Sequence, residues 1–238
     1  MDHTSTDTTA PAAQHTIRAL IFDFDGLILD TEGAAYQSWV EIYEEHGGTL
    51  TIAEWSKALG GSGLEVDHIA NLERASGKSV DSKEIFRRRL ARKLALIEAE
   101  EALPGVLDYI AEGKRLGLKL AVVSSSPHQW VDGYLAKLGI LDRFDAVICG
   151  DDAERVKPAP DLFLLSLQRL EVRPEEAIVF EDSPNGVTAA QAAGIFAVAV
   201  PNPVSAQLSV AHADLCLTSL EQMPLSDLLA RVSGTTNA

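Results

Sequence analysis

Hydrophobic residues follow two patterns along this chain. Short apolar runs rich in Val, Ile, Ala and Phe have the length of β-strands, and they cover residues 17–22, 118–123, 146–148, 177–180 and 196–200. Apolar positions at helical spacing occur between the later runs, and they cover residues 106–116, 129–138, 160–170 and 184–192. Strands that alternate with helices indicate a parallel sheet with helices on both of its faces. The pattern therefore predicts an α/β fold with a Rossmann-like parallel sheet core.

Residues 31–101, which follow the first strand, have helical periodicity and no convincing strand. One helix ends at Gly47-Gly48, and three more are expected at residues 51–59, 63–75 and 81–101. Ligands of open parallel sheets bind beyond the carboxyl ends of the strands. A helical insertion at this point would therefore lie over the site as a lid, and we predict an inserted all-helical cap domain.

The chain divides accordingly into a core, a cap and two tails. The α/β core is predicted at residues 16–31 and 104–230, and the helical cap at residues 32–103. Residues 1–15 are rich in Thr and Ala and lack the apolar stretch of a signal peptide, which predicts a disordered tail. Residues 231–238 are predicted to form a C-terminal tail.

The net charge limits the possible partners. With 35 acidic and 20 basic residues, the chain has a formal charge of −15, which argues against a nucleic-acid partner because phosphate backbones favour basic surfaces. No apolar run approaches the roughly 18 residues of a membrane-spanning helix, so we expect no membrane partner. A small anionic ligand would have to be held locally, by a metal ion and a few placed cations.

Cys149 and Cys216 are the only cysteines, and neither has the spacing of a metal or redox site. Reduced thiols are favoured over a disulfide, which predicts a cytoplasmic protein. A monomer is the default expectation.

Two carboxylates follow the first strand directly. Asp23 and Asp25 are two residues apart, so both side chains leave the same side of the chain if the strand continues. Gly26 lets the backbone turn sharply after them. Two like charges this close are unfavourable unless a cation or a shared proton compensates them. The pair therefore indicates a functional site in preference to an ordinary acidic loop.

Three further strand ends carry complementary groups. Ser124 and Ser125 begin a serine run at the start of a helix, a junction that offers hydroxyl and free N–H groups to an anion. Lys157 is an isolated cation before a proline, and Glu181 and Asp182 add carboxylates. Carboxylates from two strands favour a hard divalent ion, Mg²⁺ in particular. A carboxylate nucleophile, a second carboxylate for proton transfer, a metal and a cation suffice for phosphoryl transfer.

With these motifs in this order, the chain resembles the haloacid dehalogenase superfamily, and within it the β-phosphoglucomutase-like branch with a helical cap. The resemblance covers roughly residues 17–225 and rests on four motifs, which are Asp23-Phe24-Asp25-Gly26, Ser124, Lys157 and Glu181-Asp182. It implies that Asp23 is the nucleophile that becomes phosphorylated and that Asp25 is the general acid and base. Ser124, with Ser125 beside it, would bind the phosphoryl group, and Lys157 would orient it and neutralise its charge.

The same resemblance implies a metal site and an activity. Mg²⁺ would be held by Asp23, the backbone carbonyl of Asp25 and Asp182, with Glu181 near the ion or joined to it through water. The implied enzyme is a phosphoric monoester hydrolase. Its partner would be a small phosphorylated metabolite, such as a sugar phosphate, hydrolysed through an aspartyl-phosphate.

Three positions depart from the mutase pattern of that branch. Ala35 stands where mutases usually carry a histidine, Gly60-Gly61-Ser62-Gly63 where they tend to have an arginine, and Pro127 where they often have a lysine. The groups that bind the second phosphate of a sugar bisphosphate are therefore missing, which favours a phosphatase. Intramolecular phosphate transfer of the β-phosphoglucomutase type is the alternative, and a catalytically silent binding protein is the third hypothesis.

Two groups of residues outside the motifs have structural interpretations. The basic residues within 87–93 are expected to form a solvated helix face, in preference to an anion-binding patch. The tryptophans are expected to be packing residues, and one of them could line the inner surface of the lid. They are Trp39, Trp55 and Trp130.

Overall fold

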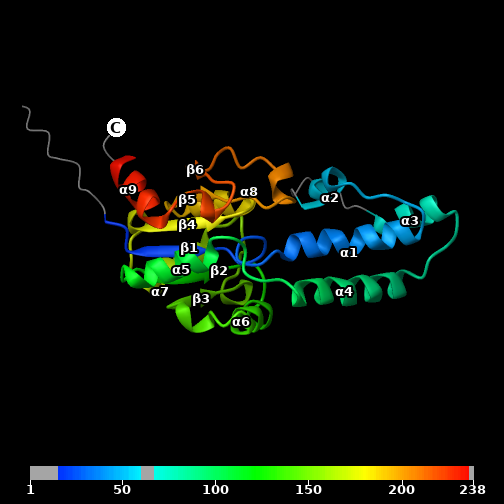
Figure 1. Cartoon of the computed structure of the whole chain (residues 1–238), viewed down its shortest axis with the longest axis horizontal. Coiled ribbons are helices and arrows are strands. Elements are labelled where there is room, and N and C mark those ends of the chain that lie inside the picture. Colours follow the sequence, from blue (N-terminus) through cyan, green and yellow to red (C-terminus); the bar gives the residue numbers. More distant parts are fainter. Residues whose placement is uncertain (1–15, 60–66, 236–238) are drawn as a thin grey trace, which may run out of the picture.

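A computed structural model describes residues 16–59 and 67–235 (Figure 1). Within these ranges, six strands form one sheet with the order β3-β2-β1-β4-β5-β6, and every neighbouring pair is parallel. The strands are β1 (Ala19–Phe22), β2 (Lys119–Val123), β3 (Ala146–Ile148), β4 (Ala177–Glu181), β5 (Phe196–Ala199) and β6 (Leu215–Cys216). The central β1 therefore ends between the ends of β2 and β4.

Successive side chains of the strands alternate between two apolar layers. Leu20 and Phe22 of β1 pack in the layer that contains α5, α6 and α9, whereas Ala19 and Ile21 pack in the layer that contains α7 and α8. Because both faces are covered, polar groups gather at the strand ends. The covering helices are α5 (Val106–Arg115), α6 (His128–Lys137), α7 (Asp161–Leu170), α8 (Pro184–Ala192) and α9 (Leu225–Thr235).

Four helices extend from the carboxyl end of the sheet as an arm (Figure 1). They are α1 (Thr31–Glu45), α2 (Ile52–Leu59), α3 (His68–Ser76) and α4 (Ser82–Glu98). The arm has its own apolar cluster, in which Trp39, Ile42, Leu72 and Ile85 are buried. The predicted fold class, a Rossmann-like parallel sheet with an inserted helical cap, is confirmed.

The chain leaves the core and returns to it at one place. Leu29 forms a β-bridge with Ala102, and the backbone N–H of Leu103 donates to the carbonyl of Ile28 at 2.8 Å. These contacts support the proposed division, with residues 32–103 as the cap and residues 16–31 and 104 onward as the core.

The structure differs from the sequence prediction in several places. β6 was not predicted, because two residues give too short a pattern. The helix predicted at 81–101 ends at Glu98, before the chain returns to the core. The core was predicted to end at residue 230 and a tail to begin at 231, which is wrong, because α9 continues to Thr235 and Val232 packs against the core. The predicted tail at 1–15 lies outside the described residues.

Short 3₁₀ helices occupy several of the connections. They are η1 (Leu141–Arg143), η2 (Gly150–Asp152), η3 (Pro174–Glu176), η4 (Ser205–Gln207) and η5 (Leu220–Gln222). Across residues 16–59 and 67–235, no helix combines the length and the apolarity that crossing a bilayer requires.

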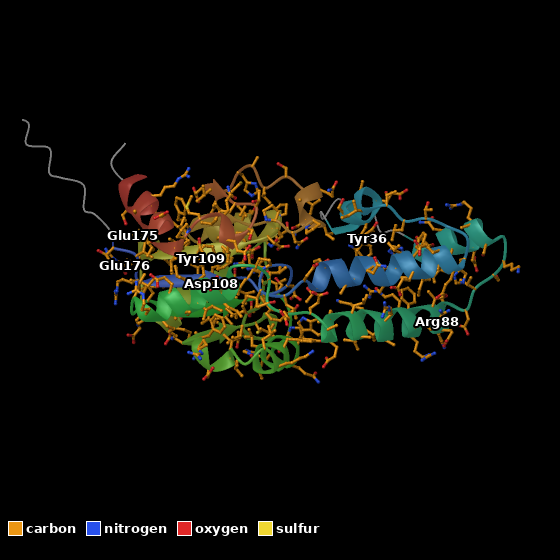
Figure 2. The ribbon with its side chains drawn as sticks, viewed as in Figure 1. Tyr36, Arg88, Asp108, Tyr109, Glu175 and Glu176 are labelled. Carbon is orange, nitrogen blue, oxygen red and sulfur yellow. The ribbon has the colours of Figure 1, made fainter. Side chains whose placement is uncertain are left out.

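Tyr109 of α5 joins the sheet to the segment before α9 (Figure 2). Its ring meets Phe180 of β4 edge-on, with ring centroids 5.3 Å apart. Its hydroxyl donates to the carbonyl of Met223 at 2.6 Å. Burial raises the pKa of Tyr109 to about 12, so the hydroxyl stays a donor.

Candidate functional site

The carboxyl ends of β1, β2 and β4 open into one cavity of about 560 Å³ between the core and the cap, a size typical of small-molecule sites. Nearly all residues that the sequence assigned to a site line this cavity, and the cap contributes Glu32 and Lys93. Glu181 is fully buried beside it. The predicted site residues that line the cavity are Asp23, Asp25, Ser124, Ser125, Lys157 and Asp182.

The ammonium group of Lys157 joins three strand ends. Its Nζ donates to Asp23 Oδ1 at 2.5 Å, to Glu181 Oε1 at 2.5 Å and to the carbonyl of Val123 at 2.8 Å. Burial lowers the pKa of Lys157, but the charges of Asp23 and Glu181 outweigh burial and hold that pKa above its ordinary value. Lys157 is therefore a fixed cation whose three protons are all used.

Asp23, Glu181 and Asp182 form a buried acidic cluster, in which one carboxylate oxygen of each lies within 4.8 Å of the others. Burial raises the pKa of Asp23 well above its ordinary value, although Lys157 opposes the shift. The pKa of Asp182 is also raised, first by burial and then by the charges of Asp23 and Glu181. Burial and the neighbouring acids thus both disfavour the ionised forms, and three carboxylates beside one ammonium group leave an excess of negative charge.

That excess of charge fits a divalent metal ion. Three carboxylates and one ammonium leave a formal charge of −2 in a buried space. The donors are all oxygen atoms, which Mg²⁺ prefers. Both oxygens of Glu181 already accept hydrogen bonds, from Lys157 and from the Ser183 hydroxyl at 3.1 Å. Glu181 therefore supports Lys157 directly, and Asp23 and Asp182 have the greater capacity to bind an ion.

The side chain of Asp25 takes no part in the acidic cluster and has different surroundings. Its Oδ1 accepts hydrogen bonds from Thr31 Oγ1 at 2.8 Å and from the indole Nε1 of Trp130 at 2.9 Å. Its Oδ2 accepts from Ser126 Oγ at 2.7 Å and from Ser124 Oγ at 3.2 Å. Four neutral donors thus hold the Asp25 carboxylate in place, apart from the acidic cluster. Its predicted part in a metal site concerned only its backbone carbonyl and stays a prediction.

Three of the groups around Asp25 were not predicted from the sequence. Trp130 was interpreted as a packing residue; it does pack against Tyr134, with ring centroids 4.7 Å apart, but its N–H also has a carboxylate partner. The signal was its place in the first turn of the helix after the serine run. Thr31 begins the first cap helix, and Ser126 alternates with Ser124, so position in the sequence also indicated these two.

Asn202 was also missed. It follows β5 between two prolines, and its Nδ2 donates to Asp182 Oδ2 at 2.8 Å and to the carbonyl of Gly26 at 3.1 Å. Gly26 has φ +84°, and a Cβ at this position would lie 2.5 Å from both Asn202 Nδ2 and Asp182 Oδ2. Only glycine therefore fits the turn after the aspartate pair. A polar residue between prolines at a strand end was the available signal.

Three comparisons relate the chain to known proteins. Residues 20–200 match the family model described as haloacid dehalogenase-like hydrolase. The chain is 43% identical over 218 residues to "Putative phosphatase YhcW" of Bacillus subtilis, with 92% of this chain and 99% of that protein covered. It is 34% identical over 181 residues to a phosphorylated carbohydrates phosphatase of Thermotoga maritima, with 75% and 82% covered. The crystal structure of a "putative beta-phosphoglucomutase" from Thermotoga maritima is 28% identical, with TM-score 0.71 and 91% and 100% covered.

His128, at the start of α6, joins the loop after β2 to the loop after β3. Its Nδ1 lies 3.0 Å from the Asp132 carboxylate, its Nε2 lies 2.8 Å from the Asp152 carboxylate, and its backbone N–H donates to Asp151. Burial lowers the pKa of His128, but the hydrogen bonds to Asp152 and Asp132 outweigh burial and raise it. His128 thus acts outside the cavity, as a support for the loop that carries the serines.

We predict that the stability difference between the wild type and His128→Asn depends on pH. A folded-state pKa above the unfolded value of about 6.5 means that the protonated ring stabilises the fold fully below that value. The stabilisation is lost as the pH rises through the folded-state pKa. Urea unfolding of both proteins between about pH 5 and pH 9 should show an advantage of the wild type that shrinks with pH. A constant difference across this range would contradict the prediction.

Proposed function

The chain belongs to the haloacid dehalogenase-like hydrolases, and on that premise we propose a Mg²⁺-dependent phosphatase that hydrolyses a small sugar phosphate through an aspartyl-phosphate on Asp23. Its family and its phosphatase-named relatives make it a phosphoric monoester hydrolase of the β-phosphoglucomutase-like branch. One observation carries the mechanism. Asp23 is bonded to Lys157 at the end of β1, and Asp25, held by four other donors, lines the same cavity.

In the first step of the proposed mechanism, a carboxylate oxygen of Asp23 attacks the phosphorus atom as the bond to the leaving alcohol breaks. Asp25 donates the proton that the leaving oxygen takes up. Ser124 Oγ, now 3.2 Å from Asp25, exchanges this weak hydrogen bond for one to a phosphoryl oxygen. Lys157 holds Asp23 in place and offsets the negative charge of the phosphoryl group.

In the second step, Asp25 accepts a proton from a water molecule as the water oxygen attacks the phosphorus of the aspartyl-phosphate. The bond between phosphorus and the Asp23 oxygen breaks, and inorganic phosphate leaves. The proton gained by Asp25 is the one that the next leaving alcohol takes up. The two carboxylates thus have separate tasks, which agrees with their separate surroundings.

We further propose that Asp23, Asp182 and the backbone carbonyl of Asp25 hold Mg²⁺, with Glu181 beside them. The charge excess of the acidic cluster supports this assignment. When bound, the ion supplies positive charge that offsets the charges of the phosphoryl group and of the acids.

The sugar-phosphate substrate is supported by a relative that is named as a phosphatase of phosphorylated carbohydrates. The mutase alternative has less support. Ala35 is buried in the apolar cluster of the cap, and Pro127 lines the cavity where a mutase often has a lysine. The third position, Gly60-Gly61-Ser62-Gly63, lies outside the described residues.

The cellular location and the oligomeric state stay predictions. The chain has two cysteines, Cys149 and Cys216, and both are free thiols, which is compatible with the proposed cytoplasmic location. We propose a monomer that needs no nucleic-acid or membrane partner.

The Asp23→Asn variant should lose its activity by at least about 10³-fold in kcat, because the nucleophile is removed. The assay uses p-nitrophenyl phosphate and a panel of sugar monophosphates with Mg²⁺. Intact-mass spectrometry after rapid quenching should detect a phosphorylated wild type and no phosphorylated variant. Asp142→Asn, which changes an exposed acid of η1, is the matched control and should keep full activity. Full activity in Asp23→Asn would show that the mechanism is wrong.

Removal of divalent ions should abolish turnover. Protein dialysed against EDTA is expected to be inactive and to recover with added Mg²⁺, and Mg²⁺ should also raise its melting temperature because the ion binds the folded state. Asp182→Asn removes one of the two excess charges, so it should need a higher Mg²⁺ concentration for half-maximal activity. Undiminished turnover in EDTA would exclude the proposed metal requirement.

Trp130→Phe should slow the enzyme by about 10-fold in kcat on alkyl phosphates, because Asp25 loses one hydrogen bond to its carboxylate. The loss should be smaller on p-nitrophenyl phosphate, whose leaving group needs little protonation. Trp55→Phe is the matched control, since the buried Nε1 of Trp55 has no hydrogen-bond partner in the described part of the chain. Equal losses on both substrates would contradict a role of Trp130 in positioning Asp25.

A further inference from the structure

The basic residues within 87–93 of α4 divide into two sets. One set is paired with glutamates on the outer surface, as the expected solvated face would be; it includes Arg88, which Figure 2 labels on α4. The pairs are Arg87–Glu84, Arg88–Glu45 and Arg92–Glu41. The other set is Arg89 and Lys93, which are four residues apart. Among the described residues, neither has an acidic partner within 4.0 Å.

Arg89 and Lys93 lie instead over aromatic rings. The Cζ atom of Arg89 is 5.6 Å from the ring centroid of Trp39 in the cap. The Nζ atom of Lys93 is 5.1 Å from the ring centroid of Trp130 in the core. Because Trp130 also donates to Asp25 at 2.9 Å, a single side chain connects Lys93 to the proposed general acid. Lys93 therefore occupies the side of the cavity on which the leaving alcohol would lie.

Glu32, in the first turn of α1, lines the same cavity as Lys93. No hydrogen bond or ion pair of Glu32 occurs within the part of the chain that the structure describes. Burial raises the pKa of Glu32, and burial lowers the pKa of Lys93. Both shifts mean that the charged groups have lost water without gaining a full partner. Their hydrogen-bonding capacity is thus left for a ligand in the cavity.

The balance of charge indicates what kind of ligand this is. The charged residues that the cap contributes to the cavity lining are Glu32 and Lys93, whose charges cancel, so they leave no net charge for a second anion. A second phosphate on the leaving group would lie beside the Glu32 carboxylate. A hydroxyl group, in contrast, can donate to a carboxylate and accept from an ammonium group at the same time. Neutral hydroxylated groups satisfy both side chains.

We infer that Glu32 and Lys93 form a specificity-determining pair that binds hydroxyl groups of the leaving alcohol and disfavours a leaving group with a second phosphate. The inference rests on the proposed function, since it takes the leaving alcohol to lie on the Asp25 side of the cavity. It assigns substrate selection to two side chains from the first and last cap helices. The phosphoryl-transfer groups of the core then act on any phosphomonoester that the pair admits.

The test compares kcat/KM for matched substrates with and without hydroxyl groups. The substrates are the best sugar or sugar-alcohol monophosphate of a panel, hexyl phosphate, and fructose 1,6-bisphosphate. Glu32→Gln and Lys93→Met should each lower kcat/KM by about 10- to 100-fold on the hydroxylated monophosphate, as expected for a lost charged hydrogen bond. On hexyl phosphate both variants should stay within about 3-fold of the wild type. Glu32→Gln should also raise the relative preference for the bisphosphate.

Matched controls come from the same two helices. Glu41→Gln on α1 and Arg92→Met on α4 change an ion pair outside the cavity and should leave the substrate ratio unchanged. The ratio of kcat/KM for two substrates does not depend on the fraction of folded enzyme, so a partly unfolded variant still gives an answer.

Three outcomes would overturn the inference. One is an equal loss on hexyl phosphate and on the sugar monophosphate, which would make the pair structural. Another is a wild type that hydrolyses hexyl phosphate as well as any sugar monophosphate. The third is a wild type that prefers the bisphosphate and loses that preference in Lys93→Met, which would assign Lys93 to a second anion. Activity retained by Asp23→Asn would instead refute the proposed function, and the two failures are therefore distinguishable.

Discussion

The rest of the site depends on the hydrogen bonds that the ammonium group of Lys157 donates. This group joins carboxylates from β1 and β4 to a carbonyl at the end of β2, so one buried cation connects three adjacent strands. A buried carboxylate without a partner costs several kcal/mol, and removal of one partner of a buried pair is typically destabilising by about 3–5 kcal/mol. The parallel sheet brings the acids together, and the positive charge of Lys157 offsets part of the repulsion between them. The remaining excess of negative charge is what gives the cluster its capacity for a divalent ion.

Asp23 and Asp25 are only two residues apart, yet their side chains have different surroundings, because the backbone turns between β1 and the cap. Asp23 stays among buried acids and is bonded to a cation, whereas Asp25 is turned toward two serines, a threonine and an indole. The turn requires Gly26, where any side chain would strike Asn202 and Asp182. One glycine thus permits two chemically identical residues to take different tasks.

The parts of the site that could be predicted lie in the segments that follow the strands, directly after the strand for Asp23 and Asp182 and further along the loop after β3 for Lys157. Parallel strands bring their carboxyl ends to one edge, so Asp23, Lys157 and Asp182 could be grouped from their positions alone. Lys93 could not be grouped with them, because it reaches the cavity from a cap helix whose orientation depends on tertiary packing, and the only signal for Trp130 was its place in the first turn of the helix after the serine run. Residues four apart share a helix face. Lys93 therefore shares a face of α4 with Arg89, whereas the paired Arg88 shares another face with Arg92, a division that composition does not show.

The bridge between Leu29 and Ala102, with the hydrogen bond from Leu103 to Ile28, means that the cap is inserted at a single closed junction. The two ends of the insertion are held together by the core, whatever the length of chain between them. Closing a longer loop costs little, about 0.6 kcal/mol for each doubling of its length. Evolution can therefore lengthen, shorten or replace the helices of the cap without altering the sheet. In this architecture the reaction and the choice of molecule it acts on can change independently of each other.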